Sequence, residues 1–572
     1  MGQPTAGKAV GSRAPGDPAP ADALVERFLD TYYRLRPVNA TFTGIHTHDG
    51  ALPDWSRAGL EAAASEMRSL REELQRTTAT GVQTTAPATP FDRELAAAFL
   101  DVQLAEIAGG QFQHGNPALW TGEAIFGIVS LMLRPFAPAS ERARAIEERL
   151  SKVAGFLGTA STTMGRKRPV PAAWVERALL ECRGAKQLVS SGVATWCRAS
   201  GVPTDITSRL DEAASAVRPA FSRFASWLHK LPGAGYEGSA CGEEFFDLLL
   251  RRGHFESRPA SELLRAARQQ FDEAVSRLHL MAAKTPPRSW PGVQRALAER
   301  RPAGPHYLAA FERLWHECRT RAVEHQLLTW PDSAIQFVEL PEWARPVAAD
   351  LYFLHYRSPA PHDPSGPTAY LVPALEAGGT PPIDTSVIKL NHVVHHGAIG
   401  HHVQNFRAYR SMSQLGRIAA VDCASRIGMF QGGTMAEGWA CYATDLMEEI
   451  GFLDELERVA QQYSRVRQLA RAIVDIELHA ARMGHAEAVR FHVERVGMSE
   501  AAAAKEVTRT SMFPGTAIMY WLGTDALHRL RAHVRGVERS RFSLRNFHDR
   551  VLSFGSVPVP LIAQAMAVET PR

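Results

Sequence analysis

The chain has 572 residues, of which 45% are hydrophobic and 22% charged, so it is long enough to bury a large globular core. Its formal net charge of +4 is spread along the sequence without a dense block of Lys and Arg, which argues against a nucleic-acid-binding surface. No run of about 18 apolar residues is present, so no membrane-spanning helix and no membrane partner are expected.

Six cysteines lie far apart and form no Cys-x-x-Cys pair. This spacing argues against a disulfide framework and against a zinc site made of cysteines. Residues 1–21 are small and polar, lack the apolar segment of a secretory signal, and are expected to form a disordered tail. Together these features predict a cytoplasmic protein.

Apolar residues recur at helical spacing through most of the chain, which predicts a mainly α-helical fold. The first helix is expected between Asp22 and Pro37. Further helices are expected over 60–76, 92–107, 138–158, 172–199, 205–230, 242–252, 259–282 and 290–324, with a polar linker at 77–90.

Two short segments, 334–340 and 349–357, have the alternation and aromatic content typical of strands. The segment 358–383 is rich in Pro, Gly and Ser and is expected to be a loop. Helices then resume over 385–409, 434–450, 454–482, 485–495, 499–511, 515–534 and 542–553. A small sheet within 332–358 is therefore expected beside the helix at 385–409, where an edge strand could hold an extended substrate by backbone pairing.

These elements suggest an N-terminal helical region over 22–240 and a second region over 241–572 that contains the sheet. No repeat of fixed period separates them. We expect both regions to form one continuous domain over 22–572.

Five histidines stand within eleven consecutive positions that end at His402. A lone histidine usually caps or lines a helix, but five on an apolar helix favour a functional cluster. On a regular helix His395 and His402 share a face about 10 Å apart, whereas His395 and His401 point to nearly opposite sides. The second pair can cooperate only across a kink, for which Gly397 and Gly400 are suitably placed.

Glu437 stands at the start of an amphipathic segment about 35 residues after these histidines. A glutamate in the first turn of a helix commonly serves only to complement the helix dipole. After a histidine-rich helix, however, it matches a zinc site made of two imidazoles and one carboxylate. We therefore predict zinc, or another divalent metal, bound by His395, Glu437 and either His401 or His402.

Two later segments carry further candidates for the site. Asp475 and His479 are four residues apart on one helical face, so they are suited either to orient a substrate-binding imidazole or to form a structural ion pair. Arg509 and Tyr520 are residue types that hold a substrate carboxylate and a developing oxyanion in hydrolases. Packing or surface roles for both residues are equally open.

In this order the motifs resemble the bacterial family known as domain of unknown function 885, whose members look like His-Glu metallopeptidases. Residues 395–404 align with the family pattern His-Glu-x-x-Pro-Gly-His-His-x-Gln, and residues 437–443 align with Glu-Gly-Trp-Ala-x-Tyr-Ala. Further motifs match at 34–56, 474–479, 509–523 and 547–558. The resemblance implies a large helical, zinc-peptidase-like (gluzincin-like) architecture acting on a peptide or small-molecule substrate, and its alignment favours His401 over His402.

One departure from the family pattern bears on activity. His396 replaces the glutamate expected to act as general base, and Ile399 replaces the family's proline. In a first interpretation the protein hydrolyses peptide or amide bonds, with His396, Glu448 or Asp475 as the base. In a second, the extra imidazole serves another metal-dependent reaction in small-molecule biosynthesis. In a third, the protein is an inactive relative that keeps the fold.

Overall fold

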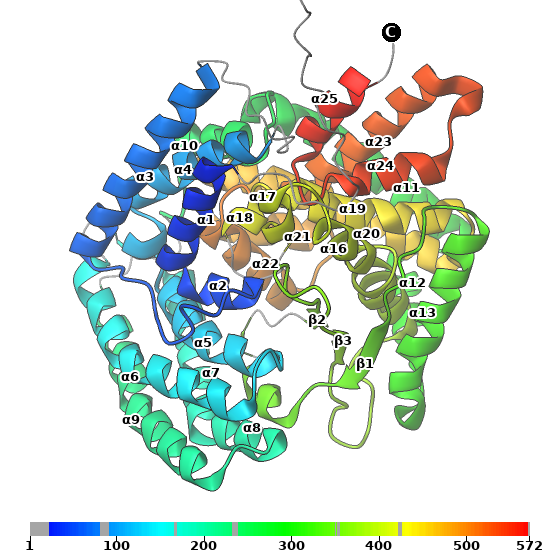
Figure 1. Cartoon of the computed structure of the whole chain (residues 1–572). Helices are drawn as coiled ribbons and strands as arrows, with labels where there is room; N and C mark the ends of the chain where they lie inside the picture. Colours follow the sequence, from blue (N-terminus) through cyan, green and yellow to red (C-terminus); the bar gives the residue numbers. More distant parts are fainter. Residues whose placement is uncertain are drawn as a thin grey trace, which may run out of the picture.

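The computed structural model describes residues 22–79, 91–164, 169–231, 238–348, 350–351, 355–420 and 426–569 (Figure 1). Within these ranges the chain is mainly helical, with one small sheet of three strands. This confirms the predicted mainly α class and the small sheet. The predicted tail over 1–21 and residues 80–90 of the predicted linker lie outside the described residues. No described helix is both long and apolar enough to cross a lipid bilayer.

The N-terminal helices lie on one side of the molecule (Figure 1). They are α1 (Ala23–Leu35), α2 (Pro37–Thr43), α3 (Arg57–Ala79), α4 (Asp92–Ala108), α5 (Pro117–Leu133), α6 (Ala139–Thr163), α7 (Ala172–Gln187), α8 (Val193–Ser200) and α9 (Thr204–Leu228). A π-helical turn, η2 (Leu188–Gly192), joins α7 to α8. Sequence periodicity missed α5 because this helix is apolar and buried around most of its circumference, so it has no polar stripe.

The next helices are α10 (Glu243–Leu248), the π-turn η3 (Leu249–Gly253), α11 (Ala260–Lys284), α12 (Trp290–Ala298) and α13 (Tyr307–Glu324). The last two were predicted as one helix over 290–324. Pro302 and Pro305 lie between them, and proline cannot continue a helix because it lacks the backbone N–H and clashes with the preceding turn.

The sheet consists of β1 (Ile335–Glu339), β2 (Tyr356–Arg357) and β3 (Thr368–Val372), in the order β1-β3-β2. β1 runs parallel to β3 and β2 runs antiparallel to it, so β1 is an edge strand. The short helix α14 (Arg345–Ala348) lies between β1 and β2 in the chain. The prediction of a loop throughout 358–383 is wrong for β3, a five-residue strand whose signal is weakened by the Pro and Gly residues on both sides.

The C-terminal part again consists of helices. They are α15 (Thr385–Val387), η6 (Ile388–Gly397), α16 (His401–Ala408), α17 (Gln414–Ile418), α18 (Arg426–Met429), α19 (Gly433–Glu449), α20 (Glu455–His479), α21 (His485–Glu494), α22 (Glu500–Met512), α23 (Met519–Glu538), α24 (Leu544–Ser553) and α25 (Val559–Glu569). The single helix predicted over 385–409 is therefore broken, and this break positions the site described below.

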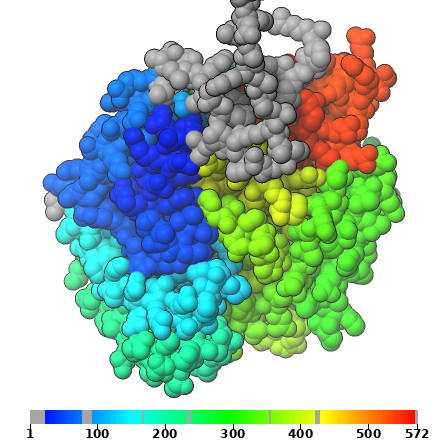
Figure 2. All heavy atoms as spheres, in the orientation of Figure 1, coloured from blue at the N-terminus to red at the C-terminus, as the bar shows by residue number. Residues whose placement is uncertain are grey.

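The largest hydrophobic core joins the two ends of the chain. Phe28 of α1 and Phe99 of α4 belong to the same buried cluster as Trp439 of α19 and Leu527 of α23. Figure 2 shows the N-terminal segment and the later segments side by side on one face. The predicted division of the chain at residue 240 stays a prediction.

Helices α19 and α23 touch backbone to backbone through two glycines. A Cβ added to Gly438 would lie 2.5 Å from the backbone of Gly523, and one added to Gly523 would overlap the carbonyl oxygen of Thr434. Glu437 directly precedes Gly438, and Tyr520 lies three residues before Gly523. The close approach of the two glycines therefore places Glu437 beside Tyr520.

Replacing Gly523 with alanine should therefore destabilise the protein. We expect Gly523→Ala to lower the free energy of unfolding by about 1–3 kcal/mol, because the added methyl group forces the two helices apart. Urea denaturation checks this, with Gly536→Ala as the matched control on the same helix. Gly536 has open space around it, so this control should be neutral or raise the free energy of unfolding by up to about 1 kcal/mol. Equal stability of both variants would contradict the tight contact.

Candidate metal centre

The helix that carries the histidines changes its winding and then breaks. Ile388–Gly397 form a π-helix, η6, and residues 398–400 turn the chain before α16 begins at His401. A side chain at Gly400 would overlap the carbonyl oxygen of His395, so this turn requires glycine. The kink needed for His395 and His401 to act together is present, and single turns of π-helix are frequent at functional sites.

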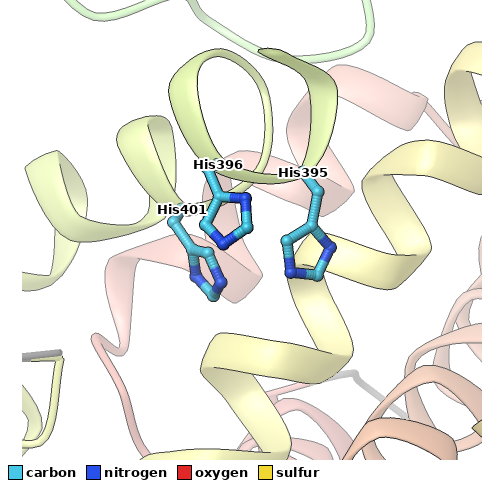
Figure 3. Close-up of side chains that lie close together, drawn as sticks. All are labelled: His395, His396 and His401. Atoms are coloured by element: carbon cyan, nitrogen blue, oxygen red, sulfur yellow. The ribbon is translucent and has the colours of Figure 1, made fainter. Parts of the chain in front are cut away.

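Three imidazoles meet at this break and point towards helix α19 (Figure 3). The ring centroids of His395 and His396 lie 4.7 Å apart, those of His395 and His401 4.9 Å, and those of His396 and His401 5.3 Å. One nitrogen of each ring lies within 4.8 Å of the corresponding nitrogens of the other two. Such a cluster of nitrogen donors suits zinc and other transition metals.

Glu437 faces this cluster from α19. Its Oε2 atom lies 3.4 Å from Nε2 of His395 and 3.6 Å from Nε2 of His401. Its Oε1 atom accepts a hydrogen bond of 3.2 Å from the hydroxyl of Tyr520. Oε2 is buried and has no hydrogen-bond partner within the described ranges of the chain. A buried carboxylate oxygen is costly unless a donor or a cation satisfies it, so a metal ion fits the space between Glu437 and the two imidazoles.

The protonation states of these groups favour metal binding. Burial lowers the pKa of His395, against the opposing effect of Glu437. Burial would raise the pKa of Glu437, but His395 and His401 hold it well below its ordinary range. A neutral imidazole and an ionised carboxylate are the forms that coordinate metals.

The tautomer of His396 follows from its hydrogen bond. Its Nδ1 atom donates to the carbonyl oxygen of Asn391 at 2.6 Å, since a carbonyl can only accept. Burial and the nearby His395 and His401 hold the pKa of His396 well below its ordinary range, so the ring is neutral. The lone pair of Nε2 is therefore left for a metal ion or a proton.

His402 does not lie with the other three. Its Nε2 atom is 3.4 Å from the carbonyl oxygen of Ser333, and its Nδ1 atom is 3.4 Å from the hydroxyl of Tyr356. The structure therefore brings His401, and not His402, next to His395. Regular-helix geometry instead placed His402 on the same face as His395, because it did not include the break.

The predicted Arg509 and Tyr520 line a cavity of about 750 Å³ together with His395, His396 and Glu437. Burial, together with the charge of Glu437, raises the pKa of Tyr520 to about 12, so the phenol keeps its proton.

Sequence reasoning missed two further arginines of the same cavity, Arg467 and Arg471. The guanidinium of Arg471 lies 4.7 Å from the centre of the Tyr520 ring. Arg467, Arg471 and the predicted Asp475 follow one another at four-residue spacing on α20, and this spacing was the available signal.

Asp475 and His479 are fully buried and do not line this cavity. Asp475 accepts hydrogen bonds from the backbone N–H groups of Gly515 at 3.1 Å and Ile518 at 3.0 Å. Nε2 of His479 donates to the carbonyl of Thr510 at 3.0 Å. Both residues hydrogen-bond the segment that connects α22 to α23. They therefore affect the site indirectly, by positioning Arg509 and Tyr520.

Glu448, the other carboxylate considered as a replacement base, also lies outside the cavity lining. It pairs with Arg465 at 2.5 Å. Of the three candidate bases, the structure therefore places only His396 in the cavity.

The fold and the site define a large, mainly helical protein whose core holds a cluster of imidazoles facing a carboxylate. The sequence model of the family described as "Bacterial protein of unknown function (DUF885)" matches residues 37–566. The chain belongs to this family, which confirms the resemblance seen in its motifs. No curated protein sequence matches the chain.

Two solved structures share the fold. One, described as a candidate lipoprotein of unknown function from Shewanella oneidensis, has a TM-score of 0.74 at 19% identity and covers 95% of this chain and 99% of its own. The other, described as a candidate lipoprotein from Colwellia psychrerythraea, has a TM-score of 0.76 at 16% identity, with coverage of 95% and 98%. At these identities the likeness establishes the fold alone.

These descriptions contradict the predicted cytoplasmic location, because a lipoprotein is held at a membrane surface by its attached lipid. We correct that prediction. It depended on the scattered cysteines together with the sequence of residues 1–21, yet Cys182, Cys197, Cys318 and Cys441 are buried in the structure. A buried cysteine packs as a small apolar residue, so its lack of a disulfide says little about the redox compartment.

Replacing Asp475 should change how stability depends on pH. Burial raises the pKa of Asp475 to about 7 from an ordinary value of 3.8, against the opposing hydrogen bonds from Ile518 and Gly515. The folded state therefore keeps this proton at pH values where the unfolded chain loses it, and the resulting stabilisation disappears as the pH rises from about 4 to about 7. Asp475→Asn removes the titrating group.

We therefore expect the free energy of unfolding of Asp475→Asn to increase relative to the wild type across this interval. Urea denaturation at several pH values measures the difference. Asp272→Asn, at a carboxylate that is 69% exposed, serves as the control. A difference between variant and wild type that does not change with pH would contradict the prediction.

Proposed function

We propose that this protein is a metal-dependent hydrolase of peptide or amide bonds, with zinc held by His395, His401 and Glu437. The observation that supports this best is the buried, unpartnered Oε2 of Glu437, which faces the Nε2 atoms of His395 and His401 at 3.4 and 3.6 Å. Bound zinc would supply Lewis-acid activation of water and of a substrate carbonyl. The order of a histidine-bearing helix followed by a glutamate-bearing helix is also that of zinc peptidases, as the family resemblance implies.

The other residues of the cavity have defined tasks in this proposal. His396 presents the Nε2 lone pair and can accept a proton, the role of the glutamate found at this position in the family pattern. The Tyr520 hydroxyl keeps its proton and donates a hydrogen bond to Glu437. In the reaction, the same hydroxyl can donate to the substrate oxygen that gains negative charge. Arg509 adds a fixed positive charge beside Tyr520.

A second candidate function has one observation in its favour. The ligand nitrogen of His396 is close enough to those of His395 and His401 for all three imidazoles to share one metal ion. A centre of three histidines would leave no general base at this position, and it would suit a metal-dependent reaction other than peptide hydrolysis.

Metal binding tests the proposed ligands. Purified wild-type protein should bind one zinc ion per chain, and His401→Ala and Glu437→Gln should each lose at least the 10–100-fold in affinity typical of a supporting residue. His402→Gln should bind zinc like the wild type, because His402 contacts Ser333 and Tyr356 instead. Elemental analysis and calorimetric titration measure this, with thermal unfolding as a check that each variant folds. No zinc in the wild type would count for an inactive relative and against both metal-dependent functions.

Restoring the family's glutamate separates the two candidate functions. If His396 replaces a general base, zinc-loaded His396→Glu should cleave a library of N-acylated peptides about 10²–10⁴-fold faster than the wild type. If His396 is a third metal ligand, the variant should instead bind zinc more weakly and show no gain in cleavage. Mass spectrometry of the products and zinc titration of the same samples distinguish these outcomes, and a chelator should abolish any cleavage.

A further inference from the structure

Three arginines on the cavity wall surround a single glutamate. Arg471 binds Glu506 through two hydrogen bonds of 2.8 Å, one from Nε to Oε1 and one from a terminal nitrogen to Oε2. Arg467 reaches Oε2 of Glu506 at a longer distance of 3.4 Å. Arg509 lies on the same helix as Glu506, three residues later. Arg467, Arg471 and Arg509 line the cavity, whereas Glu506 does not.

This arrangement leaves positive charge facing the cavity. Glu506 takes only two of the five N–H donors of Arg471, and the two carboxylates beside these arginines, Glu506 and Glu437, balance only two of the three guanidinium charges. Burial and the like charge of Arg471 lower the pKa of Arg467, so the pair is crowded. Bringing like charges together in a partly buried wall is costly unless an anion binds there.

The positive wall adjoins the metal centre. Arg471 lies over the ring of Tyr520, whose hydroxyl reaches Glu437 at 3.2 Å. Only one tyrosine side chain therefore separates Arg471 from Glu437, a proposed metal ligand. An anionic group bound here belongs to the part of a substrate next to the reacting bond.

The cavity continues away from the metal centre along α20. From Arg471 to Ala460 its wall extends over twelve residues of this helix, roughly 16 Å at the rise of an α-helix. The far part of the lining combines aromatic and apolar side chains with the polar Gln461 and Ser464: Trp290 packs against Tyr463 with ring centroids 4.4 Å apart, and Leu297 lies in the same lining.

We infer that the cavity binds the C-terminal residue of a peptide or of an N-acyl amino acid that has a large apolar side chain. Arg467 and Arg471 hold its carboxylate, and the side chain extends towards Trp290 and Tyr463. This deepens the proposed function, since a carboxylate held here places the amide bond of that residue at the metal centre. Cleavage would then occur at the last amide bond before a free carboxylate.

Binding measurements test this inference without relying on turnover. N-acetyl-L-phenylalanine and its neutral C-terminal amide are titrated into the full chain by calorimetry. The titrations are carried out in a chelator, so that neither metal coordination nor hydrolysis contributes. The acid should bind at least about tenfold more tightly than the amide, since hydrogen bonds to charged groups are the stronger kind.

Substitutions test whether Arg467 and Arg471 cause the tighter binding of the acid. Arg467→Gln should weaken binding of the acid about tenfold or more and leave binding of the amide unchanged. The double variant Arg471→Gln/Glu506→Gln should do the same without leaving the glutamate unpaired. Arg495→Gln breaks an exposed pair with Asp272 outside the cavity and is the matched control, expected to bind the acid like the wild type.

Equal affinity for acid and amide, no binding of either, or a preference that survives both arginine variants would overturn the inference. The zinc content of the same protein preparations is measured separately. Stoichiometric zinc without a preference for the acid would refute the substrate class and leave the metal centre standing. A preference for the acid in protein that binds no zinc would refute the metal centre and leave the substrate class standing.

Discussion

The negative charge of Glu437 is the constraint around which the centre of this protein is organised. A buried carboxylate must be balanced within the protein, because moving it out of water costs several kcal/mol or more. Two imidazoles from the broken helix, the hydroxyl of Tyr520 and the positive wall of α20 all face this one side chain. The glycine contact between α19 and α23 fixes the position of the carboxylate relative to Tyr520. Each helix of the centre thus contributes at least one group that is charged or hydrogen-bonded and that faces a group of another helix.

Much of this arrangement was visible in the sequence, and the rest was hidden for physical reasons. Helical periodicity located most amphipathic helices, and the motifs identified the family and named His395, Glu437 and Tyr520. Periodicity could not find α5, which has no polar face, or β3, whose five residues are too few for a clear pattern. It also could not choose between His401 and His402, since that choice depends on a π-helix and a turn that follow no simple repeat. Arg467 and Arg471 were missed because arginines on a long helix usually face solvent, and only the packing of α22 shows that these two face a cavity.

The replacement of the family's glutamate by His396 changes what the centre can do more than how it is built. The hydrogen bond from Nδ1 of His396 to the carbonyl oxygen of Asn391 orients the ring within the helix. The exchange removes one negative charge from a cavity that already carries three arginines. The net effect is a more positive cavity. In the proposed function, this charge attracts an anionic substrate to the same site where the proton acceptor has become weaker.

The π-helix η6 also restricts how the length of this segment can vary between relatives. Each of its turns closes through hydrogen bonds that reach one residue farther than those of an α-helix, so the segment holds its residues in a wider winding. Each residue of a π-helix turns the chain through less than the roughly 100° of an α-helix. An insertion or deletion that changes the winding of 388–397 would therefore change the direction in which His395 and His396 point, even though no residue of the site had been substituted. Insertions and deletions are expected in the surface connections of this fold rather than in these ten positions.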